Sequence, residues 1–583
     1  MTAAEYLVGA LRQLGVMTLF GVHGANIEDV YDAAVRTPGI TPVVAKHEFG
    51  AGAMADGVAR LGGEPGVVVT TSGGGAMNVV PALAESYDSR VPVLAIIGTA
   101  PTTMVGRGGF QDMLSPPDTI DLTAVLGGVS GSVSVVGSAD ELPAALDVAI
   151  STLRADLPAV LVIPKDIQKQ TMTTQPSAVV GWNASTVEDT DIEADADADA
   201  VAELAQRITD AIAAGRRICL WVGEEAARRR IGPQVSRLSE IVGATVVASP
   251  GGRELCSDQS SFGGVTGVMG HPSAHRAIAQ AGLCLAIGAR MTATDRGGLD
   301  AVLGRSRPDG VEVVHIGSHA PRFGGVDGRV VGDIVRSLEL LIKELGDTEL
   351  GDTDLGDTNL GDTPSPSRSS VTVEYLPEGP RRSDTPPTGV PMRVAVEAIG
   401  SQLGGVRAVF ADAGNAGASA IHYLPFGAQR FVVALGMGGM GYGIAAGVGC
   451  AIAETAAPDP QRVVVIAGDG AFLMHGMEIH TAIEHRAPLT LIVLNNNAHG
   501  MCVTREQLYF PGTPSVNRFA PADIAGGLTA LFPGLDVVRA QHRSEVEQGC
   551  AALFAASGTN CLVIDTDPDE CPPFAPFLTR GPQ

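Results

Sequence analysis

Two polar side chains stand where apolar segments of the C-terminal third end. Asp469 follows residues 462–467, and Asn496 follows residues 489–494. A segment of helical character lies between them, so the pattern predicts strand, turn, helix and strand, a βαβ unit. Both side chains then lie at the carboxyl ends of parallel strands, which is where open α/β sheets bind ligands.

The chemistry predicted for this edge is that of a magnesium–diphosphate site. Asp469 and Asn496 each offer a side-chain oxygen, and the backbone carbonyl of Ala498 offers a third. Three protein oxygens are too few for a calcium cage but suit Mg²⁺, which keeps water and takes phosphate oxygens. The helix that begins after Gly470 supplies amide donors and the positive end of its dipole for the phosphates.

A competing interpretation comes from the glycine-rich segment 436–441. It fits GxGxxG between a predicted strand, 431–435, and a helix of small residues, the pattern of a dinucleotide-binding dehydrogenase. That class needs an acidic residue about 20 positions further on to hold a ribose. Here the next strand ends at Asp469, about 30 positions on and already placed for a metal. A nicotinamide-dependent dehydrogenase stays as the alternative from another class.

Glu48 is a second carboxylate placed at a strand end. It follows the predicted strand 40–45 and begins a segment of small residues, 49–61, that reads as a helix. Apolar neighbours could bury the carboxyl group and raise its pKa, as in a catalytic acid or base. The other interpretation is a glutamate that only stabilises a helix start, and position alone favours it.

The elements around these residues predict an α/β fold with three doubly wound parallel-sheet domains. Largely apolar strands alternate with helical segments in residues 1–170, 201–345 and 391–575, as in parallel sheets covered on both faces. Residues 171–200 and 346–390 are expected to be linkers. Leu-Gly-Asp-Thr occurs four times from Leu345 onward, and its five-residue period fits neither helix nor strand, which favours a flexible tether.

Composition excludes several classes of function. A chain of 583 residues with a net charge of −25 is not attracted to nucleic acid or anionic membranes. Eight cysteines without a CxxC pair indicate reduced thiols rather than disulfides or a zinc site. The N-terminus reads as an amphipathic helix instead of a signal peptide, and no apolar run reaches the roughly 18 residues of a membrane span. We therefore expect a cytoplasmic protein.

Motifs along nearly the whole chain resemble thiamine-diphosphate-dependent enzymes of the acetolactate synthase and 2-oxo-acid decarboxylase superfamily. The spacing from Gly-Asp-Gly at 468–470 to Asn-Asn at 495–496 is that of the family. Residues 20–24, 46–60 and 71–78 resemble its FGxPG, HExxAxxxADGYAR and TSGPGATN elements, with His23 in place of the proline. Residues 109–112 and 158–166 resemble the AFQE and GPVLVDIPKD elements of acetolactate synthases.

This resemblance implies a role for each matching residue. Glu48 would hydrogen-bond the aminopyrimidine ring of the cofactor and favour the tautomer that removes the thiazolium C2 proton. Met440 would support the bent cofactor, and Asp469, Asn496 and the Ala498 carbonyl would bind Mg²⁺. The remaining cofactor contacts implied are Gly24, Gly73, Asn78, Gly414, Asn415, Gly438, Gly468, Gly470, Ala471, Asn496, Gly500 and Met501. The substrate-pocket residues implied are His23, Phe110, Gln111, Met501 and Arg505.

The implied reaction is covalent catalysis on a 2-oxo acid such as pyruvate. After loss of CO₂, the enamine either adds to a second carbonyl, as in a carboligase, or is protonated to an aldehyde, as in a decarboxylase. In the family, the first and third domains meet across a subunit interface, so a homodimer or homotetramer is implied. Retention of Glu48, Asp469 and Asn496 argues against an inactive scaffold that only binds the cofactor.

Departures from the family pattern limit the choice of substrate. The His-His pair of pyruvate-type decarboxylases is absent after the first glycine-rich loop, which favours ligation. Arg505 stands where synthases place a tryptophan near the pocket. Residues 288–296 only loosely match the synthase element GxRFDDR, which helps to hold substrate and FAD. FAD therefore stays an unsupported option.

Overall fold

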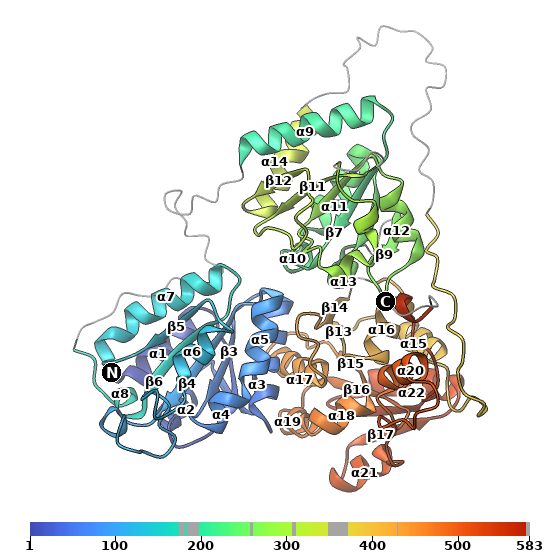
Figure 1. Cartoon of the computed structure of the whole chain (residues 1–583). Helices are drawn as coiled ribbons and strands as arrows, with labels where there is room; N and C mark the ends of the chain where they lie inside the picture. The colour runs from blue at the N-terminus through green and yellow to red at the C-terminus, as the bar shows by residue number, and fades with distance from the viewer. Residues whose placement is uncertain are drawn as a thin grey trace.

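The computed structural model describes residues 1–173, 181–182, 197–256, 261–305, 310–347, 371–427 and 429–578. They form three α/β units, each built on a six-stranded sheet whose strands all run parallel. Figure 1 shows the three units as separate lobes, here called domain I (β1–β6), the central domain (β7–β12) and domain III (β13–β18). The predicted fold class is confirmed.

Domain I has the strand order β2-β1-β3-β4-β6-β5. Its strands are β1 (Thr18–Val22), β2 (Thr41–Val44), β3 (Gly66–Thr70), β4 (Val93–Thr99), β5 (Ser132–Val135) and β6 (Ala159–Pro164). Its helices are α1 (Ala3–Gln13), α2 (Glu28–Arg36), α3 (Glu48–Leu61), α4 (Gly74–Asn78), α5 (Val80–Ser89), α6 (Leu122–Gly127), α7 (Leu142–Arg154) and α8 (Lys165–Gln168). The edge strand β5 was not predicted, because its alternating serines keep it only half buried.

The central domain has the strand order β12-β11-β10-β7-β8-β9. Its strands are β7 (Ile218–Val222), β8 (Thr245–Ala248), β9 (Phe262–Val265), β10 (Leu283–Ile287), β11 (Glu312–Gly317) and β12 (Gly328–Val331). Its helices are α9 (Ala198–Ala213), α10 (Glu224–Arg228), α11 (Gly232–Val242), α12 (Pro272–Ala279), α13 (Ala293–Arg296) and α14 (Ile334–Asp347). Helix α14 includes the first Leu-Gly-Asp of the repeat, and the remaining repeats lie outside the described residues.

Domain III has the strand order β14-β13-β15-β16-β18-β17. Its strands are β13 (Ala408–Ala411), β14 (Arg430–Val433), β15 (Val463–Gly468), β16 (Leu489–Asn495), β17 (Asp536–Ala540) and β18 (Asn560–Asp565). Its helices are α15 (Met392–Gly400), α16 (Asn415–Tyr423), α17 (Tyr442–Glu454), α18 (Asp469–His475), α19 (Glu478–Glu484), α20 (Gly500–Tyr509), α21 (Ile524–Leu531), α22 (Arg543–Ala555) and α23 (Ala575–Leu578). The helical segment predicted between Asp469 and Asn496 is two helices, α18 and α19, since it breaks at Gly476, a poor helix former.

Domains I and III are joined by α3 and α17, which lie side by side in Figure 1. Both helices consist largely of glycine and alanine and are buried along most of their length. A Cβ on Gly57 of α3 would lie 2.7 Å from the carbonyl oxygen of Ala446 on α17. The small residues therefore permit a close helix contact that fixes the two domains in one arrangement.

Among the helices in the described ranges, none combines the length and apolar character that crossing a bilayer requires.

Candidate functional site

A cavity of about 300 Å³ opens at the carboxyl ends of β13, β15 and β16 in domain III. It brings together every residue of this domain that was predicted to contact cofactor, metal or substrate. These are Gly414, Asn415, Gly438, Met440, Gly468, Asp469, Gly470, Ala471, Asn496, Ala498, Gly500, Met501 and Arg505. The in-register pairing of β15 with β16, Gly468 opposite Leu494, is what places the two strand ends together.

Asp469 carries a buried oxygen that has no hydrogen-bond donor. Its Oδ1 accepts a hydrogen bond from the Gly470 amide at 2.9 Å, whereas its Oδ2 has no partner. Burial raises the pKa of Asp469 to about 6 although nearby backbone amides act in the opposite direction. Beside it, the Oδ1 of Asn496 accepts from the Ala498 amide at 3.0 Å. A divalent cation bound here would compensate the buried negative charge of Asp469. The oxygen atoms of Asp469, Asn496 and Ala498 therefore fit Mg²⁺.

Helices α16, α18 and α20 all begin at the cavity wall, with Asn415, Asp469 and Gly500 as their first residues. Helix N-termini favour anions because their amides and dipoles point toward the ligand. Both polar side-chain atoms of Asn415 are buried without a partner. A Cβ on Gly500 would lie 2.7 Å from the Nδ2 of Asn415, so glycine keeps this corner open. These residues fit a diphosphate group next to the metal.

Met440 lies on the glycine-rich loop 436–441, here called the Met440 loop. Gly438 and Gly441 have φ angles of +65° and +88°, a conformation that favours glycine. Asp412, at the end of β13, accepts from the amides of Gly441 (2.9 Å) and Gly443 (2.8 Å). Burial raises the pKa of Asp412 to about 6, against the effect of these amides. Asp412 was not predicted, although its position directly after a strand was a usable signal.

The predicted catalytic residue, Glu48, lies in domain I and does not line this cavity. It is the first residue of α3 and is 9% exposed. Its Oε2 accepts a hydrogen bond from the Nδ2 of Asn78 at 2.9 Å. Burial, and secondarily the charge of Glu48, raises the pKa of the nearby Tyr31 hydroxyl. Glu48 is therefore a buried carboxylate with few donors.

The other predicted residues of domain I gather near Glu48, at the carboxyl edge of the same sheet. Gln111 accepts a hydrogen bond from the Ser72 hydroxyl at 2.9 Å and covers Gly73, since a Cβ on that glycine would lie 2.6 Å from the Nε2 of Gln111. Gly24 packs against Thr71 in the same way. The ring of His23 lies 4.9 Å from that of Tyr31. Phe110 stands out by being 86% exposed.

The predicted residues thus form two groups within one chain. The residues that line the domain III cavity come from positions 392–566, and none of them belongs to domain I. Seven lining residues were missed by the sequence: Met392, Ala413, Ala416, Leu494, His499, Cys502 and Thr566. His499 and Cys502 adjoin predicted residues and could have been found by proximity. Met392 and Thr566 carry no local signal.

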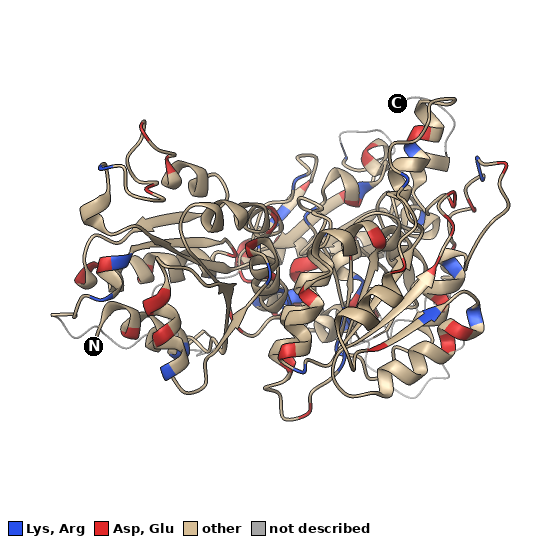
Figure 2. Ribbon diagram, turned by 90° about the horizontal axis from the view of Figure 1, so that it is seen from below, with Lys and Arg blue, Asp and Glu red and all other residues tan. Residues whose placement is uncertain are grey.

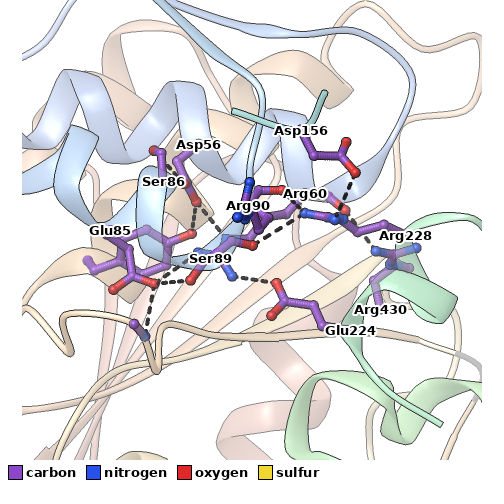
Figure 3. A network of polar contacts seen from close by, with 12 residues as sticks. Asp56, Arg60, Glu85, Ser86, Ser89, Arg90, Asp156, Glu224, Arg228 and Arg430 are labelled. Atoms are coloured by element: carbon purple, nitrogen blue, oxygen red, sulfur yellow. Dashed lines mark hydrogen bonds and ion pairs between the residues drawn. The ribbon is translucent and has the colours of Figure 1, made fainter. Parts of the chain in front are cut away.

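At the carboxyl ends of its strands, the central domain offers little room for FAD. A cavity of about 40 Å³ lies at the carboxyl ends of β7, β10 and β11, which is room for a few water molecules at most. Side chains at the contact between domain I and the central domain occupy this region. Arg322 pairs with Asp88 at 2.7 Å. Arg228 donates to the carbonyl of Arg90, as Figure 3 shows. Arg296, from the loosely matching element 288–296, pairs with Asp300 of its own domain. The cavity at this edge of the sheet does not fit a flavin dinucleotide, and FAD stays without support.

Three family models match the chain in order. They describe the N-terminal TPP binding domain of thiamine pyrophosphate enzymes at residues 1–122, the central domain at 205–341 and the C-terminal TPP binding domain at 412–565. None of these descriptions is that of a nicotinamide-dependent dehydrogenase.

Curated relatives and a solved structure agree with these models. The mitochondrial acetolactate synthase catalytic subunit of Saccharomyces cerevisiae is 25% identical, over 100% of this chain and 82% of the relative. The acetolactate synthase isozyme 2 large subunit of Escherichia coli is 27% identical, over 97% of this chain and 96% of the relative. An X-ray structure of a protein from Mycobacterium smegmatis, assigned provisionally as a thiamin diphosphate-dependent enzyme, has a similar fold. It superposes with a TM-score of 0.76 at 22% identity, over 97% of this chain and 99% of that one. With all three domains matched in order, this chain belongs to the thiamine pyrophosphate-dependent enzymes and is of the acetolactate synthase type.

Proposed function

We propose that this chain is a thiamine-diphosphate- and Mg²⁺-dependent carboligase that acts on a 2-oxo acid such as pyruvate. The observation that carries the proposal is the unpartnered Oδ2 of Asp469 beside the unpartnered side chain of Asn415, in one cavity where three helices begin. Such a wall is matched to a divalent cation bound to a diphosphate. The names of the yeast and E. coli relatives support acetolactate synthesis as the reaction.

The chain's residues would bind and orient the cofactor as follows. Asp469, Asn496 and the Ala498 carbonyl hold Mg²⁺, and Asn415 with the helix N-termini binds the diphosphate. Met440 packs beneath the cofactor. When bound, thiamine diphosphate supplies the nucleophilic carbon and the electron sink that release of CO₂ requires.

Glu48 would hold a proton at the pyrimidine ring nitrogen. Its burial at 9% exposure and its single side-chain partner, Asn78, leave one carboxylate oxygen for this bond. A carboxylate in this position favours the cofactor tautomer that acts as the base. The general acid–base step is thus assigned to domain I, whereas the metal and diphosphate belong to domain III.

We propose that a second copy of the chain completes the site. The cavity is lined by domain III alone, so the domain I group around Glu48 would reach it from a partner subunit. Such a contact would bury several apolar side chains that are exposed in the single chain. They are Met437 in the Met440 loop (56% exposed), Leu473 and Met474 on α18 (58% and 53% exposed), and Phe110. A homodimer is the smallest assembly with complete sites, and a homotetramer contains the same contact.

The choice between ligation and simple decarboxylation depends on whether the activated donor reacts with a second carbonyl compound or with a proton. Met501, Cys502 and Arg505 lie on the first turns of α20 and line the cavity, where they would contact the acceptor. A synthase-like element at 109–112 and the missing His-His pair favour a second carbonyl compound over a proton. A 2-oxo-acid decarboxylase that releases an aldehyde is the alternative. We place the enzyme in the cytoplasm, in line with its eight free thiols.

The test is incubation of the purified chain with thiamine diphosphate, Mg²⁺ and a panel of 2-oxo acids, with and without aldehyde acceptors. We expect CO₂ release from pyruvate together with a product of the mass of acetolactate. Aldehyde as the sole product would favour the decarboxylase. Lack of CO₂ release from every 2-oxo acid, with cofactor shown to be bound, would refute both.

A further inference from the structure

A buried glutamate of domain I reaches into the Met440 loop of domain III. Glu85 lies on α5, is 2% exposed and does not line the cavity. Its Oε2 accepts hydrogen bonds from the amides of Met437 (2.6 Å) and Gly438 (3.3 Å), and its Oε1 accepts from the amide of Gly436 (3.3 Å). Three consecutive amides of one loop thus point at a single carboxylate, 351 positions earlier in the chain.

The charge on Glu85 is held by a network that involves all three domains (Figure 3). The Oε1 of Glu85 accepts from Nη2 of Arg60 at 3.0 Å and from the Ser89 hydroxyl at 2.6 Å. Arg60, itself 2% exposed, also pairs with Asp56 at 2.6 Å and with Glu224 of the central domain at 2.6 Å. Charged residues of both signs lie together at this junction in the middle of Figure 2.

The balance of these contacts keeps Glu85 ionised. Burial by itself would raise the pKa of Glu85, but the Arg60 guanidinium and the hydrogen bonds from Ser89 and the loop amides outweigh it, and the pKa lies below its ordinary value. A charged acceptor forms stronger hydrogen bonds to amides than a neutral one does. The loop is therefore bound to α5 by charge-assisted bonds in a water-poor environment.

The Met440 loop is fixed at both ends by buried carboxylates. Glu85 binds its first three amides, while Asp412 binds the amides of Gly441 and Gly443 at its other end. Close packing supports the first end, because a Cβ on Gly436 would lie 3.0 Å from the Ser89 hydroxyl and 3.1 Å from the Oε1 of Glu85. Met440 stands between the two ends, and its methyl carbon lies against Gly470 in the cavity.

We propose that Glu85 is a positioning residue that sets the place of Met440, and through it the bound cofactor, from the neighbouring domain of the same chain. The inference rests on the proposed function in one respect, namely that the cavity beside Met440 binds thiamine diphosphate. It adds that cofactor binding depends on the contact between domains I and III within one subunit, in addition to any contact with a partner. Glu85 itself touches neither cofactor nor substrate.

The test compares Glu85→Gln with Glu224→Gln. Both variants remove one carboxylate that pairs with Arg60, but only Glu85 binds the loop amides, so Glu224→Gln is the matched control. The first readout is hydrogen–deuterium exchange of residues 436–443 in the chain without cofactor. The second is the Kd of thiamine diphosphate with Mg²⁺, measured by calorimetry, alongside kcat at saturating cofactor.

We expect Glu85→Gln to raise exchange in the loop and to weaken cofactor affinity by about tenfold, with a smaller change in kcat. Glu224→Gln should leave both the exchange and the Kd within about twofold. Unchanged exchange and affinity in Glu85→Gln, or equal losses in the two variants, would overturn the proposal. If wild-type chain binds no thiamine diphosphate, the proposed function fails, whereas the exchange comparison still decides the role of Glu85 in the loop.

A second variant covers the case in which Glu85→Gln does not fold. Glu85→Asp keeps the negative charge for Arg60 but withdraws the carboxylate by one methylene from the loop. We expect it to unfold at a temperature near that of wild type and still to show raised loop exchange and weakened cofactor binding. Wild-type exchange in this variant, with the fold intact, would count against positioning by Glu85.

Discussion

At the scale of single residues, the two candidate groups differ in how their polar atoms are satisfied. Asp469 and Asn415 retain buried atoms without partners, which costs free energy unless a ligand supplies the missing contacts. Glu48 is buried with one side-chain donor, Asn78. An inactive protein would gain nothing from buried polar atoms without partners. Asp469, Asn415 and Glu48 are therefore the residues at which the proposed function can be tested.

Asp469→Ala removes the only carboxylate of the proposed metal set. We expect the Mg²⁺-dependent affinity for thiamine diphosphate to fall by at least about 100-fold, while the fold is retained because Asp469 makes no side-chain ion pair in the described structure. Isothermal calorimetry with and without Mg²⁺ measures the change. Asp565→Ala is the control, since it follows the same pattern at the end of β18 but lies outside the cavity. Equal affinity in wild type and Asp469→Ala would contradict the metal assignment.

Glu48→Gln keeps the size of the side chain and removes its acid–base function. We expect kcat to fall by at least about 100-fold with the Kd of thiamine diphosphate changed little, because the residues proposed to hold the diphosphate and metal lie in domain III. Steady-state rates at saturating cofactor, combined with calorimetry, separate the two effects. Turnover at the wild-type rate would remove Glu48 from the mechanism.

At the scale of elements, packing of the segment before α12 against α16 keeps two buried histidines neutral. His271, before α12 of the central domain, stacks on His422 of α16 with ring centroids 4.7 Å apart. The Val265 amide donates to Nδ1 of His271, and the Leu376 amide donates to Nε2 of His422. Each ring must therefore accept a hydrogen bond, which a protonated histidine cannot do.

Acidification should loosen this junction. Burial first, and then His422, lowers the pKa of His271 to about 3, and burial lowers that of His422 to about 4. At these two histidines the unfolded chain, with ordinary pKa values near 6.5, binds more protons than the folded chain, so their contribution to the free energy of unfolding falls as pH drops below about 6.5. From pH 6.5 to 5 the loss is about 1.6 kcal/mol per histidine.

Urea unfolding followed by tryptophan fluorescence at pH 7 and pH 5 measures this dependence. Buried carboxylates with raised pKa values, among them Glu254 and Glu570, act in the opposite direction, so the wild-type chain is compared with a variant at both pH values. Because His422→Gln cannot titrate at this position, its midpoint should shift toward higher urea relative to wild type when the pH is lowered from 7 to 5. An identical change of midpoint with pH in wild type and His422→Gln would contradict a neutral, buried His422 at the junction.

At the scale of the whole molecule, the separation of Glu48 from the Asp469 cavity predicts complementation between inactive variants. In a dimer whose sites lie between subunits, Glu48→Gln paired with Asp469→Ala has one doubly altered site and one intact site. Random mixing should therefore restore about a quarter of wild-type activity. Each variant mixed with itself is the control. Sites contained within single chains would give no recovery, and that result would refute the proposed subunit contact.

Much of this architecture was predictable because parallel strands buried on both faces are continuous apolar runs. The apolar segments 462–467 and 489–494, for example, predict β15 and β16 to within one residue at each end. The edge strands β5 and β12 were missed because their outer faces are exposed and their residues alternate. The break between α18 and α19 was missed because a single glycine within a helical pattern is a weak signal.

The sequence by itself determined which polar side chains follow which strands. Asp469 follows β15, Asn496 follows β16 and Glu48 follows β2. These relations are local, since a turn depends on residues only a few positions away. Only the tertiary structure decided that Asp469 keeps a buried oxygen unpaired and that Glu48 lies outside its cavity. The same holds for Glu85, which binds a loop 351 positions distant. Such partners depend on how the domain surfaces pack, and no local pattern in the chain encodes that packing.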